Sequence, residues 1–201
     1  MKLFHAAASP YVRKVMVTLH ETGQVDQVET VPGATTPLDP NPVLLEQNPL
    51  GRIPALVTED AGTLFDSRVI CRYLNARAGA GLYGTGGAEF PIIGREALAE
   101  GMIDSCLLTV YEGRLRPEEK VHQPYIDGQL GKVRRAMAAF NARIGEMSGD
   151  LTIDKIALGC GIGYADFRLP DLGWRDDNPA LAEWYAAFAD RPSMQATIPA
   201  G

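Results

Sequence analysis

The sequence predicts an α/β domain followed by an all-α domain, and two observations lead to this prediction. Strand-like and helix-like segments alternate over residues 1–78, whereas apolar residues beyond residue 90 recur only at helical spacing. Residues 79–89, which lie between, are rich in glycine, as is typical of a flexible linker. We therefore expect an N-terminal α/β domain at 1–78, a linker at 79–89 and an all-helical bundle at 90–201.

The first half of the α/β domain has a β–α–β pattern. Residues 2–5 are a short apolar strand candidate, and the apolar residues at 12, 15, 16 and 19 share one face of a helix. Ser9 followed by Pro10 indicates where this helix begins, because a capping hydroxyl precedes a proline at the first helical position. The β-branched residues at 25–31 predict a second strand.

The second half of this domain has a β–β–α pattern. Residues 55–58 and 63–65 predict two strands joined by a hairpin turn at Asp60-Ala61-Gly62. Asp66 and Ser67 then cap a helix with apolar residues at helical spacing. The order β–α–β, crossing loop, β–β–α is that of a thioredoxin-like domain.

The helical domain is predicted from four apolar patterns. Residues 91–112 read as one long helix, and further helical faces begin at Val133, Ile156 and Leu181. The sequence therefore predicts a bundle with no strand in this half of the chain.

The composition argues against several classes of partner. The chain has 201 residues, of which 46% are hydrophobic, and a formal net charge of −6. An acidic chain lacks the basic face that nucleic acid requires, and no apolar run approaches the length of about 18 residues that spans a membrane. Three scattered cysteines and three scattered histidines give neither a disulfide framework nor a metal-ligand spacing. With no signal peptide evident, we expect a cytoplasmic protein without a metal.

The stretch Gln47–Val57 carries the most information. Pro54 has no N–H, which suits a tight turn before a strand rather than the strand itself. If the Ile53–Pro54 bond is cis, the main chain of Ile53 faces outward and can pair with an extended ligand. The alternative is an ordinary proline at a strand entry.

Three motifs, Ser9–Val15, Asn48–Leu56 and Leu64–Ile70, resemble those of the cytosolic glutathione transferases, in the serine-type, bacterial-like form. Their order and spacing also match, densely over residues 1–78 and more weakly beyond. The resemblance implies a thioredoxin-like domain that binds glutathione as co-substrate, followed by a helical domain, in a homodimeric detoxification enzyme. It also implies that residues 67–77 lie near the partner's bundle.

The resemblance implies roles for residues of the second and third motifs. The main chain of Ile53, before a cis Pro54, would pair with the cysteinyl unit of glutathione. A carboxylate at Asp66 suits an α-ammonium, and the Ser67 hydroxyl with a helix N-terminus suits an α-carboxylate, although both residues can also simply cap their helix. Arg52 would lie near the glycyl carboxylate, unless it is only a solvated surface residue. The implied glutathione-binding residues are therefore Asn48, Arg52, Ile53, Pro54, Asp66 and Ser67.

Ser9 is the catalytic residue that the resemblance implies. A free thiol has a pKa of about 8.5, and a hydroxyl that donates to the thiolate favours the charged form. Tyr11 is a rival donor, although its position after Pro10 favours a wall of the substrate pocket. No cysteine lies in residues 1–70, which disfavours mixed-disulfide chemistry at this motif.

A pocket for a small hydrophobic electrophile would complete the enzyme. Its expected walls are Ala7, Tyr11, Met102, Cys106 and Tyr111, although each can also be an ordinary core residue. Isomerase, reductive dehalogenase and peroxidase activities that use glutathione stay open. The alternative from another class is a non-catalytic binding or regulatory protein with a glutathione transferase-like fold.

One departure from the family pattern occurs in the helical domain. The family's core helix usually opens with Ser/Thr-x-x-Asp, a capping box, whereas Thr152 is followed three residues later by Lys155. A lysine cannot return the hydrogen bond of a capping box, so we expect Thr152 to cap alone or the helix to begin elsewhere.

Overall fold

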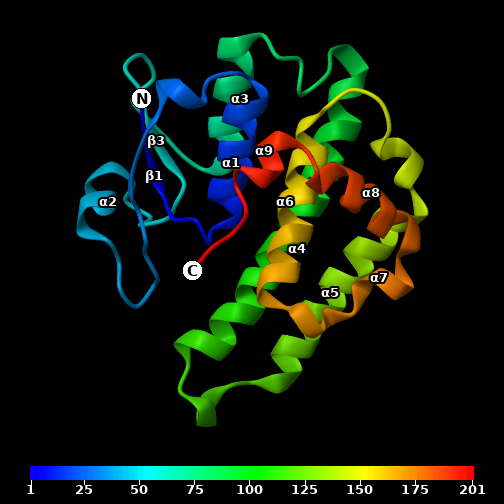
Figure 1. Ribbon diagram of the computed structural model, residues 1–201. Helices are drawn as coiled ribbons and strands as arrows, with labels where there is room; N and C mark the ends of the chain where they lie inside the picture. Colours follow the sequence, from blue (N-terminus) through cyan, green and yellow to red (C-terminus); the bar gives the residue numbers. More distant parts are fainter. The chain divides into compact units, whose positions relative to one another are not determined.

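A four-stranded mixed sheet forms the centre of the first of two units in the computed structural model, which describes residues 1–201 (Figure 1). The strands β1 (Lys2–His5), β2 (Glu29–Pro32), β3 (Ala55–Val57) and β4 (Thr63–Leu64) lie in the order β2-β1-β3-β4. β2 pairs with β1 in parallel, whereas β3 pairs with β1 and β4 antiparallel. This confirms the thioredoxin-like order expected from the sequence.

Three helices accompany the sheet: α1 (Pro10–Glu21), α2 (Pro42–Gln47) and α3 (Ser67–Ala78). α1 and α3 pack against each other, and Val12, Val15 and Leu19 of α1 and Ile70 and Leu74 of α3 are buried. The second strand starts later than expected, because Val25–Gln27 forms a 3-10 helix and only Glu29–Pro32 joins the ladder. Gly23, with φ +66°, adopts the left-handed conformation that commonly ends a helix.

The second unit, Glu89–Arg191, is all-helical, as expected. Its main helices are α4 (Glu89–Leu115), α5 (Gln123–Ala142) and α6 (Ile153–Arg168), followed by α7 (Trp174–Asp177) and α8 (Pro179–Ala189). No helix has both the length and the apolar character needed to cross a membrane. Short 3-10 helices occupy Gly86–Ala88, Glu118–Lys120, Ile144–Met147 and Pro170–Leu172.

The core of this unit is built where α6 crosses α4. Every residue from Ile153 to Ala165 on α6 is buried. Gly161 permits the close approach, because a Cβ at this position would lie 2.7 Å from Met102 Cε and 3.1 Å from Ile103 Cγ1. A side chain at this position would require Met102 and Ile103 to shift within the packed core.

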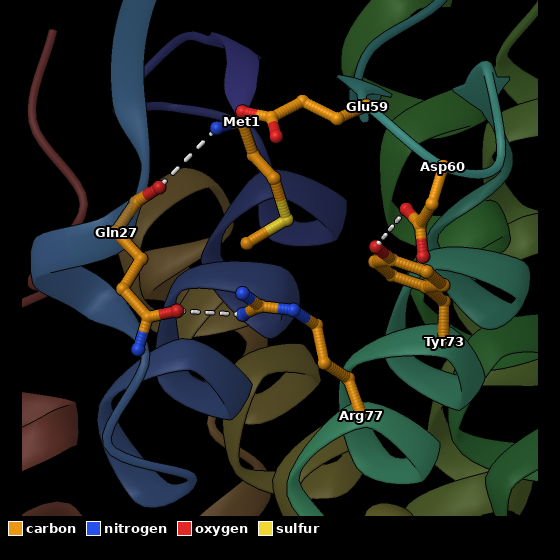
Figure 2. Close-up of a pocket in the computed structure, with 6 residues that line it drawn as sticks. All are labelled: Met1, Gln27, Glu59, Asp60, Tyr73 and Arg77. Atoms are coloured by element: carbon orange, nitrogen blue, oxygen red, sulfur yellow. Dashed lines mark hydrogen bonds between the residues drawn. The ribbon is translucent and has the colours of Figure 1, made fainter.

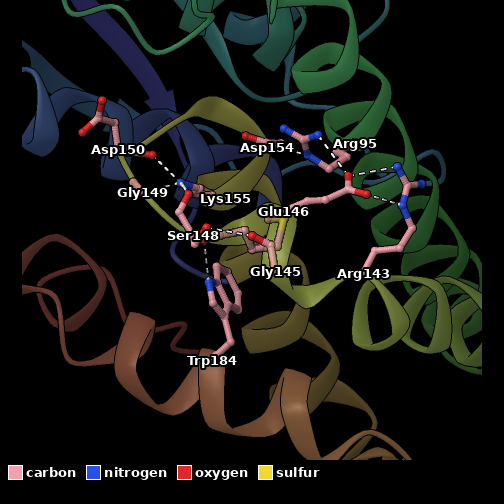
Figure 3. Close-up of polar contacts among 11 residues, drawn as sticks. Arg95, Arg143, Gly145, Glu146, Ser148, Gly149, Asp150, Asp154, Lys155 and Trp184 are labelled. Atoms are coloured by element: carbon pink, nitrogen blue, oxygen red, sulfur yellow. Dashed lines mark hydrogen bonds and ion pairs between the residues drawn. The ribbon is translucent and has the colours of Figure 1, made fainter.

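The start of α6 lacks the reciprocal bond of a capping box, as expected, but the expectation that Thr152 caps alone or that the helix begins elsewhere is wrong (Figure 3). Thr152 is the N-cap residue, but its side chain caps no N–H, and its Oγ1 is buried without a partner. Lys155 instead donates to the carbonyl oxygens of Ser148 (2.6 Å), Gly149 (3.1 Å) and Asp150. The lysine therefore secures the loop that leads into the helix rather than the helix N-terminus itself.

A second set of charges holds the same helix start. Arg95 of α4 donates to Asp154 Oδ2 at 2.6 Å and pairs with Glu146 at 3.3 Å, and Glu146 also binds Arg143 at 2.7 Å (Figure 3). Asp154 is fully buried and sits in the first turn of α6, where a negative charge is favourable. This ion pair therefore holds a carboxylate in the first turn of α6 and ties the helix start to α4.

The segment Pro192–Gly201 belongs to the first unit, although we expected it to continue the helical domain. It contains α9 (Pro192–Gln195), which packs against α1. The physical reason is a buried cation on α1: Arg13 donates from Nη2 to the carbonyl of Met194 at 3.1 Å. The first unit is thus built from residues 1–88 and 192–201.

Candidate functional site

The register of the sheet brings the three motifs to one end of it. Phe4 on β1 pairs with Ala55 on β3, so the residues after β1 lie beside the residues before β3. Leu56 pairs with Leu64, so the residues after β4 also reach this end. Because neighbouring strands lie about 4.8 Å apart, Ser9, Ile53 and Asp66 lie near one another at the same end of the sheet.

Ser9 is the N-cap residue of α1. Its Oγ accepts a hydrogen bond from the main-chain N–H of Val12 at 3.3 Å, and its carbonyl accepts the first helical bond from Arg13 at 2.9 Å. Pro10 follows at the first helical position, as the sequence predicts. The hydroxyl is therefore fixed at a helix N-terminus, where the helix dipole favours an anion.

The Ile53–Pro54 peptide bond is cis, as the family resemblance implies. Pro54 is buried, and the β3 ladder begins only at Ala55, so the main chain of Ile53 lies outside the ladder. The Ile53 side chain packs against the small apolar cluster of Phe4, Leu44 and Ala55. An extended ligand can therefore find main-chain groups at Ile53.

Gly33 lies at this end of the sheet, and sequence reasoning did not single it out. Its N–H donates to the His5 carbonyl at 2.8 Å, just beyond the β1–β2 ladder. A Cβ at Gly33 would lie 2.8 Å from His5 N and 3.0 Å from Ile53 Cγ2, so only glycine fits between these groups. The signal available in the sequence was a glycine directly after a strand that ends in proline.

Asn48, one of the expected glutathione-binding residues, bonds within its own turn. It is buried, its Nδ2 donates to the Arg52 carbonyl at 2.8 Å and its Oδ1 accepts from Leu50 N–H at 3.0 Å. The amide thus spans the turn that carries Arg52 to the surface. Arg52 itself is exposed and has no ionic partner within the chain, so its guanidinium can meet an anion.

Asp66 and Ser67 open α3, as the third motif predicts. Asp66 is the N-cap residue and accepts from Arg68 N–H through Oδ1 at 2.9 Å. Its side chain is exposed, and Oδ2 has no partner within the chain, so capping uses only half of the carboxylate. Ser67 is buried at the first position of the helix. Capping and ligand binding are therefore compatible at this pair.

His5 is the titratable side chain nearest in sequence to the Ala6–Ser9 loop. Partial burial lowers the pKa of His5 from its ordinary value. The imidazole is thereby favoured in its neutral form at this end of the sheet. Sequence reasoning considered His5 only as a metal ligand, and the structure gathers no group of three or more His, Cys, Asp or Glu residues suited to a metal.

A polar hollow of about 410 Å³ lies at the opposite end of the sheet (Figure 2). Asp60 accepts a 2.6 Å hydrogen bond from the Tyr73 hydroxyl, which lowers the pKa of Asp60 and raises the pKa of Tyr73. Arg77 donates to Gln27 at 2.7 Å on the other wall. Met1 directly precedes β1, whereas Ser9 follows the other end of this strand. The residues that line the hollow therefore include none from the three motifs.

The five expected walls of the electrophile pocket have different surroundings. Ala7 is exposed and Tyr11 half-buried near Ser9 in the first unit. Met102 and Cys106 lie within the apolar core of the second unit, where burial raises the pKa of the Cys106 thiol to about 12. These two residues therefore pack the helical core, and the thiol is kept protonated. Tyr111 is half-buried on α4, and its part in a pocket stays a prediction.

Sequence comparison identifies the family of this chain. A profile of the "Glutathione S-transferase, N-terminal domain" matches residues 8–77, and a profile of the "Glutathione S-transferase, C-terminal domain" matches residues 123–187. The chain therefore belongs to the glutathione S-transferase family.

Individual relatives agree with this assignment. The "Uncharacterized GST-like protein YibF" of Escherichia coli K12 is 30% identical over 204 residues, which cover 99% of this chain and 98% of that protein. The crystal structure of a glutathione transferase family member from Pseudomonas fluorescens Pf-5, with bound glutathione, is 44% identical with a TM-score of 0.96 and covers 100% of this chain and 99% of that one. The glutathione S-transferase from Methylobacillus flagellatus KT, with glutathione bound, is 34% identical with a TM-score of 0.89, and 99% of each chain is covered.

Proposed function

We propose that this chain is a glutathione transferase that ionises the glutathione thiol with the help of the Ser9 hydroxyl. The observation that carries the proposal is the hydrogen bonding of Ser9. Its Oγ accepts from Val12 N–H at 3.3 Å, and no group within the chain accepts its proton. That proton is therefore available to a thiolate sulfur, and accepting a bond from Val12 polarises the hydroxyl as a donor.

The energy of one such hydrogen bond is sufficient for the task. Lowering a thiol pKa by about 2 units requires about 2.7 kcal/mol of preference for the thiolate. A hydrogen bond to a charged acceptor contributes about 1.5–3 kcal/mol. The N-terminus of α1 adds a smaller favourable term for an anion. Ser9 acts as a hydrogen-bond donor in this proposal and not as a nucleophile.

The remaining residues at this end of the sheet suit the charges of glutathione. The free oxygen of Asp66 would accept from the α-ammonium, and Ser67 with the start of α3 would bind the α-carboxylate. The main chain of Ile53 would pair with the cysteinyl unit, beside Pro54. Arg52 would meet the glycyl carboxylate, and Asn48 would hold the turn that presents it. Relatives crystallised with bound glutathione support this assignment.

The proposed reaction is attack of the thiolate on an electrophilic carbon of a small apolar compound. The sulfur supplies the electron pair of the new C–S bond. The displaced pair departs with a leaving group or, in an addition, takes a proton from solvent. Ala7 and Tyr11 would flank the reacting sulfur, and Tyr11 is the rival donor to it. No protein thiol takes part, since all three cysteines are buried.

A cytoplasmic homodimer is the form in which we expect the enzyme to work. Phe90, Leu98 and Leu108 are exposed on α4, with relative exposures of 75%, 36% and 41%. Three large apolar side chains exposed on one helix suit a protein partner, and a second copy is the partner expected of this family. Gel filtration at micromolar concentration tests this point, and a monomer would contradict it.

The function is tested by ultraviolet difference titration of the glutathione thiolate on the purified protein. We expect a thiolate signal about 1–2 pH units below the free thiol, and Ser9→Ala should shift it back by a similar amount while glutathione still binds. Ser9→Thr retains the hydroxyl and should titrate like the parent. An unchanged profile in Ser9→Ala would transfer the role to Tyr11 or a main-chain donor. No binding at millimolar glutathione would leave the non-catalytic binding or regulatory protein as the function.

A further inference from the structure

The segment Pro192–Gly201 runs along α1 toward Ser9, in the direction opposite to the helix. Ser193 Oγ donates to Glu21 Oε1 at 2.5 Å, at the last residue of α1. Arg13 Nε donates to Thr197 Oγ1 at 3.4 Å, one turn from Ser9. A Cβ at Gly201 would lie 3.9 Å from the Cβ of Ala8. Figure 1 accordingly shows α9 beside α1, with the last residues at the start of α1.

Arg13 fixes the position of this segment. Its side chain is 6% exposed, and it donates to the carbonyl of Met194 at 3.1 Å as well as to Thr197. The Thr197 hydroxyl in turn donates to the carbonyl of Ser193 at 2.8 Å. Removing these acceptors would leave a buried cation with unsatisfied donors, so the contact is costly to break. The residues that follow Thr197 are therefore held near Ser9 rather than free to move away.

The residues so held are entirely apolar. Positions 198–201 read Ile-Pro-Ala-Gly, and Gly201 approaches Ala8 in a second apolar run, Ala6-Ala7-Ala8, directly before Ser9. Ile198 is 60% exposed, although it is the one large apolar side chain among residues 198–201. Its exposed surface would gain from contact with an apolar ligand.

We infer that residues 198–201 form a wall of the electrophile site beside Ser9, and that Ile198 sets how large an apolar group the enzyme prefers. This inference rests on the proposed function, since it concerns the group that reacts with the Ser9-bound thiolate. Arg13 and Thr197 are positioning residues for this wall. The favoured electrophiles carry an uncharged alkyl or aryl group on the reacting carbon.

The inference is tested by binding of inert S-alkylglutathiones, in which the alkyl group occupies the place of the electrophile. Calorimetry gives the dissociation constants of S-methylglutathione and S-hexylglutathione for the parent, Ile198→Ala and Val25→Ala. Val25 lies beyond the other end of α1 and serves as a matched apolar truncation. We expect the parent to bind the hexyl compound more tightly, because each buried methylene contributes about a fourfold gain.

Ile198→Ala removes three side-chain carbons that would contact the hexyl group. It should therefore reduce the preference for S-hexylglutathione over S-methylglutathione about three- to tenfold. The dissociation constant of S-methylglutathione should not change. Val25→Ala should leave both values unchanged. Thr197→Val, which keeps the size but loses the bond from Arg13, should reduce the preference by a smaller factor. An unchanged preference in Ile198→Ala, an equal loss for both ligands, or no hexyl preference in the parent would overturn the inference. Failure of the parent to bind glutathione itself would overturn the proposed function as well.

Discussion

α4 and α6 cross closely at Gly161, and this packing decides whether Gly161→Ala raises or lowers the free energy of unfolding. Replacing glycine by alanine inside a helix normally stabilises a protein by about 0.5–1 kcal/mol. At Gly161 the new Cβ would lie 2.7 Å from Met102 Cε and 3.1 Å from Ile103 Cγ1, so it would overpack the core. Overpacking of this kind costs about 1–3 kcal/mol.

Gly128 in α5 provides the matched control, because a Cβ there would meet no atom within 4 Å. The gain in helix propensity is common to both positions, so the difference between Gly161→Ala and Gly128→Ala isolates the overpacking, at about 1–3 kcal/mol. Urea unfolding followed by far-ultraviolet circular dichroism measures the free energy of unfolding of each variant. Met102→Leu, which removes the terminal methyl position, should recover part of the loss in the double variant. Equal stabilisation by both alanines would refute the claim that Gly161 is needed for packing.

Three further predictions concern the candidate site. Asp66→Asn keeps an N-cap oxygen but loses the charge, so it should weaken glutathione binding about tenfold in calorimetry with little change in stability, whereas equal affinity would remove Asp66 from the site. Gly33→Ala would place a Cβ 2.8 Å from His5 N, and its displacement of the strand end should weaken glutathione binding measurably, while Gly87→Ala, with open space around its Cβ, should not. Burial lowers the pKa of His5, so the folded chain binds fewer protons than the unfolded chain below about pH 6.5. The free energy of unfolding should therefore decline as the pH falls below this value. His5→Gln should make the urea midpoint depend less on pH. The same dependence in the variant and the parent would contradict this prediction.

The motifs of the first unit could be predicted from sequence because their structure is local. Ser9 before Pro10 and Asp66 before Ser67 are helix starts, and a cap depends on residues within one turn. The cis bond before Pro54 could be anticipated for the same reason. The strand register brings these local features to one end of the sheet. The sequence predicted the order of the elements but not this register.

The features that escaped prediction depend on contacts distant in sequence. The resemblance implies that Asn48 contacts the ligand, and the structure adds that its amide donates one hydrogen bond and accepts one within its own turn. Met102 and Cys106 share the helical spacing of pocket residues and of core residues alike, and periodicity cannot separate the two. The position of residues 192–201 rests on Arg13, and a side chain bond across 181 residues leaves no periodic signal.

The divided composition of the first unit has a consequence for the order of folding during synthesis. A ribosome completes residues 1–88 first, then the whole helical unit, and only then the residues that accept the hydrogen bonds of Arg13. Until those last residues emerge, α1 carries a guanidinium whose buried partners are absent. Synthesis of the thioredoxin-like unit therefore begins before that of the helical unit and ends after it. A chimaera that exchanges residues 1–88 alone would separate Arg13 from residues 192–201, to which it donates its hydrogen bonds.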